Sequence, residues 1–219
     1  MTTTETTLAE LACTQPAAAR VFLAHGLDFC CKGRRSLAAA CSEKGLDPAA
    51  VLAELAASAG AEDLTAWSER PAPDLVRHIV TRYHEALRRD LPALIAMAEK
   101  VEARHADKPT VPVGLAGHLR AMHLAVLDHL AKEESILFPA ILSGRGAMCG
   151  GPIQVMEAEH VDHGENLTRM RALAGDLVPP PEACTTWRAL YLGMANLERE
   201  LMEHIHLENN VLFPRVLMA

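Results

Sequence analysis

Two stretches of the chain, HLAKEESILFPAIL (residues 129–142) and HIHLENNVLFPRVL (residues 204–217), follow one plan. Each starts with a histidine, has a glutamate four residues later, and reaches Leu-Phe-Pro four residues after the glutamate. On a helix this spacing places His129 beside Glu133, and His204 beside Glu208, on one face. Because a buried carboxylate next to a buried imidazole is costly, two such pairs indicate a shared compensating charge such as a metal ion.

Four segments have apolar residues at helical spacing: residues 74–105, 113–142, 153–173 and 183–217. Long helices with short connections predict an all-α protein whose main part is an antiparallel up-down four-helix bundle. In the second segment the expected core stripe is Met122, Ala125, His129, Glu133, Ile136 and Ala140. Shorter helical stretches fill the N-terminal residues, and SERPAPD (68–74) is the expected linker. We therefore expect a small helical N-terminal domain at 1–66 and the bundle at 74–219.

The first and third segments add His84 and His160 at a similar level of the bundle. At a rise of 1.5 Å per residue, counting from the helix ends places six side chains in one layer roughly 10 Å thick. These six candidate ligands are His84, His129, Glu133, His160, His204 and Glu208. Nitrogen and oxygen donors without thiolates suit iron, manganese or zinc. Two carboxylates can bridge two metals, which predicts a dimetal centre open to small ligands such as O2 or NO.

Several neighbouring residues are given supporting or unrelated roles. We expect Glu134 and Glu159 to be solvated or to orient the imidazoles. Phe138 and Phe213 are expected to shield the layer of candidate ligands. Pro139 and Pro214 are expected to bend or end their helices. His105 lies about 31 Å along the helix from His84 and is expected at the surface or at a second site. The remaining off-stripe histidines are expected at the surface or in grooves: His78, His123, His163 and His206.

The composition narrows the classes of function. The net charge is -7 and the basic residues are scattered, so we expect no nucleic-acid partner. No apolar run reaches the roughly 18 residues of a membrane span, and the N-terminus lacks the pattern of a signal peptide. The chain is therefore expected in the cytoplasm, away from membranes, with its six cysteines as free thiols or ligands.

The paired segments resemble the hemerythrin-like superfamily of non-haem di-iron proteins. HGLDFCCKGRRSL (residues 25–37), placed ahead of such a bundle, is similar to the RIC ("repair of iron centres") family. The resemblance implies two non-haem iron ions with an oxo or hydroxo bridge, held by the six candidate ligands, with Glu133 and Glu208 bridging. It also implies partners that are damaged or apo iron-sulfur proteins, and action under nitrosative or oxidative stress.

Cys30 and Cys31 are the candidate reactive residues of the N-terminal domain. Cationic neighbours favour the thiolate form, and Lys32, Arg34 and Arg35 follow the pair. We interpret the pair as a thiol relay for iron or redox equivalents, with a buried small apolar pair as the alternative. The other cysteines are expected to be structural or incidental: Cys13, Cys41, Cys149 and Cys184.

The sequence leaves three functions open. The first is repair of iron-sulfur clusters by supplying iron. The second is binding or scavenging of nitric oxide, or its enzymatic reduction to nitrous oxide at the di-iron centre. The third is an oxygen or redox sensor that signals through the N-terminal domain. A homodimer through that domain is an additional expectation, because so short a unit makes only a small core.

Overall fold

The computed structural model of the chain describes residues 2–57 and 64–218. By packing, the chain divides into two compact units. Unit 1 comprises Met1–Arg77, Ile141–Gly150 and Met202–Ala219, and unit 2 comprises His78–Ala140 and Gly151–Leu201. The division into domains at 1–66 and 74–219 concerns folding units rather than packing, and it stays a prediction.

The described residues form helices of three kinds. The α-helices are α1 (Leu8–Thr14), α2 (Ala18–Ala24), α3 (Leu37–Lys44), α4 (Pro48–Ala57), α5 (Ala72–His78), α6 (Glu85–Arg104), α7 (Leu115–Lys132), α8 (Phe138–Leu142), α9 (Gly150–Leu173), α10 (Thr185–His206) and α11 (Phe213–Leu217). The short 3-10 turns are η1 (Leu64–Trp67), η4 (Gly146–Met148) and η5 (Gly175–Leu177). The π-helical segments are η2 (Ile79–His84), η3 (Glu133–Leu137) and η6 (Leu207–Leu212).

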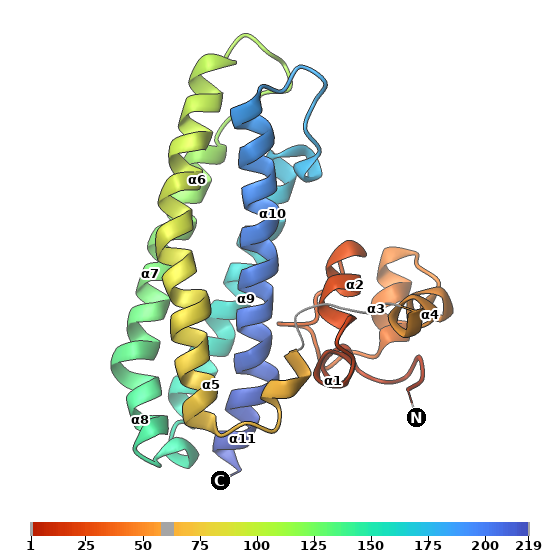
Figure 1. Cartoon of the computed structure of the whole chain (residues 1–219), viewed down its shortest axis with the longest axis vertical. Coiled ribbons are helices and arrows are strands. Elements are labelled where there is room, and N and C mark those ends of the chain that lie inside the picture. The colour runs from red at the N-terminus through yellow and green to blue at the C-terminus, as the bar shows by residue number, and fades with distance from the viewer. Residues whose placement is uncertain (1, 58–63, 219) are drawn as a thin grey trace. The chain divides into compact units, whose positions relative to one another are not determined.

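Unit 2 is built from the long helices α6, α7, α9 and α10, which run alternately up and down (Figure 1). Their inward faces are aliphatic, and on α10 Leu190, Met194, Leu197 and Leu201 are all buried. The predicted all-α class and up-down four-helix bundle are therefore confirmed. Among the described residues, no helix is both long and apolar enough to cross a membrane.

One predicted core stripe is partly wrong. Ala125 and Ile136 are exposed, whereas Val126 and Leu137 are buried in their place. The physical reason at Ile136 is η3, because a π turn inserts one extra residue and moves the buried face on by one position. The predicted stripe therefore holds at Met122, His129 and Glu133, is wrong at Ala125, and shifts by one residue after Glu133.

The π segments also explain why the two helices continue past their prolines. The backbone N–H of Phe138 bonds to the carbonyl of Glu133, and that of Phe213 to the carbonyl of Glu208, five residues back. Proline normally breaks a helix because it lacks the N–H for the usual i→i-4 bond. A π turn already disrupts that ladder, so α8 and α11 follow without a break. Of the two expectations for these prolines, that they end their helices is wrong, and that they bend them stays a prediction.

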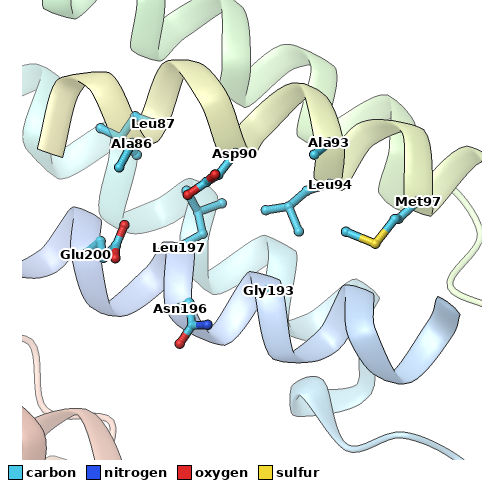
Figure 2. A pocket seen from close by; sticks show the side chains of 10 residues that line it. All are labelled: Ala86, Leu87, Asp90, Ala93, Leu94, Met97, Gly193, Asn196, Leu197 and Glu200. Carbon is cyan, nitrogen blue, oxygen red and sulfur yellow. The ribbon is translucent and has the colours of Figure 1, made fainter. Parts of the chain in front are cut away.

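Helices α6 and α10 approach closely at Gly193, and a cavity of about 250 Å³ lies between them. A Cβ atom at Gly193 would lie only 2.6 Å from Leu94 Cδ2. Figure 2 shows Leu94 directed from α6 toward Gly193 on α10, with Asp90 and Glu200 further along the same cavity. The absence of a side chain at Gly193 therefore leaves room for the Leu94 side chain between these helices.

Unit 1 contains the N-terminal helices, whose ends have recognisable caps. Thr7 and Glu10 form a capping box at α1, and Asp47 accepts a hydrogen bond of 2.9 Å from the backbone N–H of Ala49 at the start of α4. Gly45 ends α3 in a left-handed conformation with φ of 66°. The core of unit 1 includes the fully buried rings of Phe22 and Phe29. Threonine, aspartate and glycine are the residue types that helix ends of these kinds favour.

Candidate metal centre

Four of the candidate ligands converge in the core of unit 2, and we call His84, His129, Glu133 and His160 the ligand cluster. Their exposed fractions are 1% or less. Nε2 of His129 lies 3.1 Å from Nε2 of His160. Glu133 Oε2 lies 3.4 Å from Nε2 of His84 and 3.5 Å from Nε2 of His129. Three imidazole nitrogens therefore lie around one buried carboxylate.

The donor set of the ligand cluster fits a metal ion. A carboxylate that has left water needs compensation, and the Nε2 atoms of His129 and His160 face each other at 3.1 Å, so both rings direct a nitrogen to the same place. Imidazole and carboxylate donors are the ligands of iron, manganese and zinc. We therefore identify the ligand cluster as a candidate metal site.

Carboxylates behind two of the histidines fix their orientation. His84 Nδ1 lies 2.7 Å from Glu134 Oε1, and His129 Nδ1 lies 2.9 Å from Glu159 Oε2. With Nδ1 engaged in this way, Nε2 is left to face the interior, an arrangement typical of metal-bound histidines. The expectation that Glu134 and Glu159 orient imidazoles is confirmed.

Cationic side chains in turn hold both of these carboxylates. Arg88 pairs with Glu134 at 2.9 Å, and Lys132 pairs with Glu159. Burial alone would raise the pKa of Glu134, but hydrogen bonds from Arg88 and His84 outweigh it and lower that pKa below its ordinary value. Glu134 is therefore ionised near neutral pH and able to accept from the imidazole.

The two remaining candidate ligands lie in unit 1, and we call His204 and Glu208 the ligand pair. His204 Nε2 lies 2.9 Å from Glu208 Oε1, and both side chains are fully buried. His204 belongs to the last turn of α10 and Glu208 to η6. The i, i+4 relation predicted from the sequence is therefore realised as a direct contact.

Residues next to Glu208 hold the thiol motif, DFCCKG at residues 28–33. The Asn209 side chain donates to the Cys30 carbonyl at 3.1 Å, and that of Asn210 donates to the Phe29 carbonyl at 3.2 Å. The ring of His206 lies 5.5 Å from the ring of Phe29. Within unit 1, the thiol motif is thus anchored to the helical turn that carries Glu208.

The environment of the thiol motif corrects one expectation. The thiols of Cys30 and Cys31 contact each other, with their Sγ atoms 3.4 Å apart. A hydrogen bond with Cys31, burial, and the nearby Asp28 raise the pKa of Cys30 well above its ordinary value. The prediction that cationic neighbours favour a thiolate is wrong for Cys30, because its sulfur faces Cys31 and the Asp28 carboxylate, at 3.3 Å.

Several other residues differ from their expected positions. His163 and His206 are buried rather than at the surface, and burial lowers the pKa of His206 to about 4. The ring of His163 packs edge-on against the ring of His129 at 4.9 Å. Phe138 stacks on His84 at 5.8 Å, which confirms its shielding role. The i+3 spacing from His160 was the signal that could have placed His163 on the inner face.

A helical bundle with buried histidine and glutamate donors is a metal-binding bundle of the hemerythrin class, and comparison with known proteins agrees. The model of the hemerythrin HHE cation binding domain matches residues 75–216. The model of ScdA_N, a domain of unknown function (DUF542), matches residues 4–59. The metal-binding bundle and the separate N-terminal region are therefore both found in known families.

The chain is also similar over nearly its whole length to several named proteins. It is 48% identical to the iron-sulfur cluster repair protein YtfE of Citrobacter koseri, over 96% of each chain. It is 47% identical to the proteins of that name from Cronobacter sakazakii, over 96% of this chain and 95% of the relative, and from Escherichia coli, over 96% of each. The chain therefore belongs to this family, and its resemblance to the RIC proteins is confirmed.

Proposed function

We propose that the protein is a non-haem di-iron protein that repairs iron-sulfur clusters damaged by nitrosative or oxidative stress, by supplying iron. The observation that carries the proposal is the buried cluster of three imidazoles around Glu133 in unit 2. The relatives are named iron-sulfur cluster repair proteins, and this name supports the proposed process. The partners are then damaged or apo iron-sulfur proteins, with NO and O2 as small ligands.

The sequence repeat predicts that the di-iron centre would draw on the ligand cluster and the ligand pair together. His129 and His160, whose Nε2 atoms face each other, would share one iron. The repeated sequence assigns the corresponding roles at the second iron to His204 and His84. Glu133 and Glu208 would bridge the irons. Imidazoles and carboxylates of these residues would hold the irons, which could then also bind small ligands such as O2 or NO.

The bound irons would supply a redox-active and exchangeable metal, and the surrounding residues would control its retention. Imidazole ligands must be deprotonated at the bound nitrogen, so metal release is coupled to proton uptake. Glu134 and Glu159 fix the tautomers of His84 and His129 from the outside. Their side chains are 32% and 23% exposed, so solvent protons can reach this outer layer.

Cys30 and Cys31 remain our candidates for a thiol relay in this function. Cys30 is buried and its pKa is raised, whereas Cys31 is half-buried. In the proposal, Cys31 is therefore the thiol that reacts first with a partner. Cys30 is the thiol that then attacks the bond formed at Cys31. Cytoplasmic location and a homodimer through the N-terminal residues complete the proposal.

The test is transfer of labelled iron. The protein is loaded with isotopically labelled ferrous iron without oxygen, then mixed with an apo or NO-damaged iron-sulfur enzyme, sulfide, thiol and an iron chelator. We expect the label in the rebuilt cluster despite the chelator, and no transfer from the Glu133→Leu, Glu208→Leu double variant. Label that stays in the bundle, or equal repair by that variant, would contradict iron donation. Release of nitrous oxide over several turnovers with NO would instead support the alternative function.

A further inference from the structure

A cysteine and a histidine that the proposed function does not use meet at the far end of unit 2. His105 Nε2 lies 3.2 Å from Cys184 Sγ. His105 directly follows α6 and Cys184 directly precedes α10, so each sits at a helix end. Both side chains are partly exposed. This contact places an imidazole within reach of a thiol proton.

The pair opens into a surface cavity of about 480 Å³ whose lining is basic. Lys100 and Arg104 line it together with His105, Cys184 and Thr186. The N-terminus of α10 adds the partial positive charge of a helix of 22 residues. An anionic ligand is thus favoured beside the Cys184 sulfur. One carboxylate opposes this charge: Glu182, two residues before Cys184, accepts a hydrogen bond of 2.5 Å from Thr110 and lies within electrostatic reach of Lys108 and His105.

The loop that carries Cys184 is held in place. Arg188 donates from Nε to the Ala183 carbonyl and from Nη2 to the Pro181 carbonyl, each at 3.1 Å. The backbone N–H of Arg188 also bonds to the Cys184 carbonyl at 3.0 Å. On the other side, the ring of His105 lies 5.2 Å from the buried Trp187 ring. The thiol and the imidazole are therefore both positioned before any ligand arrives.

We propose that Cys184 and His105 form a thiol-exchange site for small anionic disulfides of the glutathione type. The Cys184 proton passes to His105 Nε2, and the sulfur attacks one sulfur of the disulfide. A new S–S bond forms to Cys184 as the S–S bond of the incoming disulfide breaks. The leaving thiolate takes the proton from His105, so one disulfide is exchanged for one mixed disulfide and one free thiol.

The other cysteines of the chain differ from Cys184 in their surroundings. Cys13 also faces a histidine, but its Sγ lies 3.9 Å from Nε2 of His206. Burial, together with the charge of Glu10, raises the pKa of Cys13 to about 11. Cys30, Cys41 and Cys149 are buried. Selectivity for Cys184 therefore follows from its imidazole, its access and its basic surroundings.

The test uses the iron-loaded full chain and glutathione disulfide, with the modified cysteine identified by peptide mass mapping. We expect Cys184 to react at least roughly 10-fold faster than Cys31 or Cys13, since a positioned base gives about 10²- to 10⁴-fold. His105→Gln should lower the rate by at least roughly 10-fold, while Cys13→Ser should leave it unchanged. Iron content serves as the folding control, because neither His105 nor Cys184 is among the proposed ligands.

Charged and uncharged disulfides test the basic lining separately from the Cys184–His105 pair. Arg104→Gln should slow the reaction with glutathione disulfide by roughly 3-fold and leave the uncharged 2,2′-dipyridyl disulfide unaffected. Added salt should weaken the reaction of the anionic probe alone. In a Trp67→Phe background, the fluorescence of Trp187 should change with modification. First modification at another cysteine, or an unchanged rate in His105→Gln, would overturn the proposal.

Discussion

The two repeated segments, residues 129–142 and 204–217, share their backbone but differ in what surrounds their glutamates. Both pass through a π turn after the glutamate, in η3 and η6, and both continue as helix through Phe-Pro. After Glu133 comes Glu134, which holds His84 at 2.7 Å. After Glu208 comes Asn209, which instead holds the carbonyl of Cys30 at 3.1 Å.

This difference separates the residues that the two segments share from the residue that determines the contacts of each segment. The repeated residues include the candidate metal donors, and a π turn follows the glutamate in both segments. The residue after each glutamate is not repeated, and it decides which neighbour the segment organises. In one case that neighbour is another candidate ligand, and in the other it is the thiol motif.

The largest expected effect comes from removing either glutamate. Glu133→Leu and Glu208→Leu should each abolish binding of both irons, because each carboxylate is proposed to bridge the two. Iron per chain, measured after anaerobic loading and desalting, checks this. The apo forms should unfold no more easily than the apo parent, because a buried charge has been removed. A variant that keeps one tightly bound iron would break the proposed equivalence of the segments.

The residue after each glutamate gives the next effect. Glu134→Ala should weaken metal binding by about 10- to 100-fold, since it removes the group that orients His84. Asn209→Ala is the matched control and should leave iron affinity unchanged. Competition with a chelator of known affinity measures both. Equal losses in the two variants would show that the segments do not differ in the way described.

Asn209 and Asn210 test whether the second segment holds the thiol motif. Replacing either with alanine should cost about 1 kcal/mol of stability, because a partly buried carbonyl of Cys30 or Phe29 loses its donor. The reaction of Cys31 with a thiol reagent should become faster as the motif loosens. Urea unfolding and thiol labelling measure the two effects. Unchanged stability with unchanged labelling would mean that these asparagines do not anchor the motif.

The smallest effect is expected at the prolines. Pro139→Ala and Pro214→Ala should change stability by less than about 1 kcal/mol, whereas relief of a helix-breaking proline is worth about 3 kcal/mol. The reason is that both π turns already release the hydrogen bond that proline cannot make. A stabilisation near 3 kcal/mol in either variant, seen in thermal or urea unfolding, would contradict this account.

Most of the fold could be predicted because its signals are local. Helical periodicity, the caps at Thr7 and Asp47, and the His-Glu spacing all act within a few residues. The π turns escaped prediction, and with them the shift of the buried face from Ile136 to Leu137. Sequence spacing alone does not show where an extra residue is inserted, although Pro139 and Pro214 were available as signals.

The ligand candidates could be predicted for the same reason, whereas tertiary contacts could not. His105 and Cys184 are 79 residues apart, and only the helix ends bring them together. The pKa of Cys30 was misjudged because its charged neighbours in sequence are not the groups that its sulfur faces. Asp28 and Cys31, rather than Lys32, are in contact with it.

The central claim is that the two segments each provide half of one di-iron site. The most direct measurement is electron paramagnetic resonance and iron counting on the partly oxidised, iron-loaded protein. The account predicts two irons per chain whose spins are coupled through bridging ligands, with the coupled signal lost in Glu208→Leu. Two uncoupled irons, or one iron that survives in that variant with an unchanged signal, would contradict it.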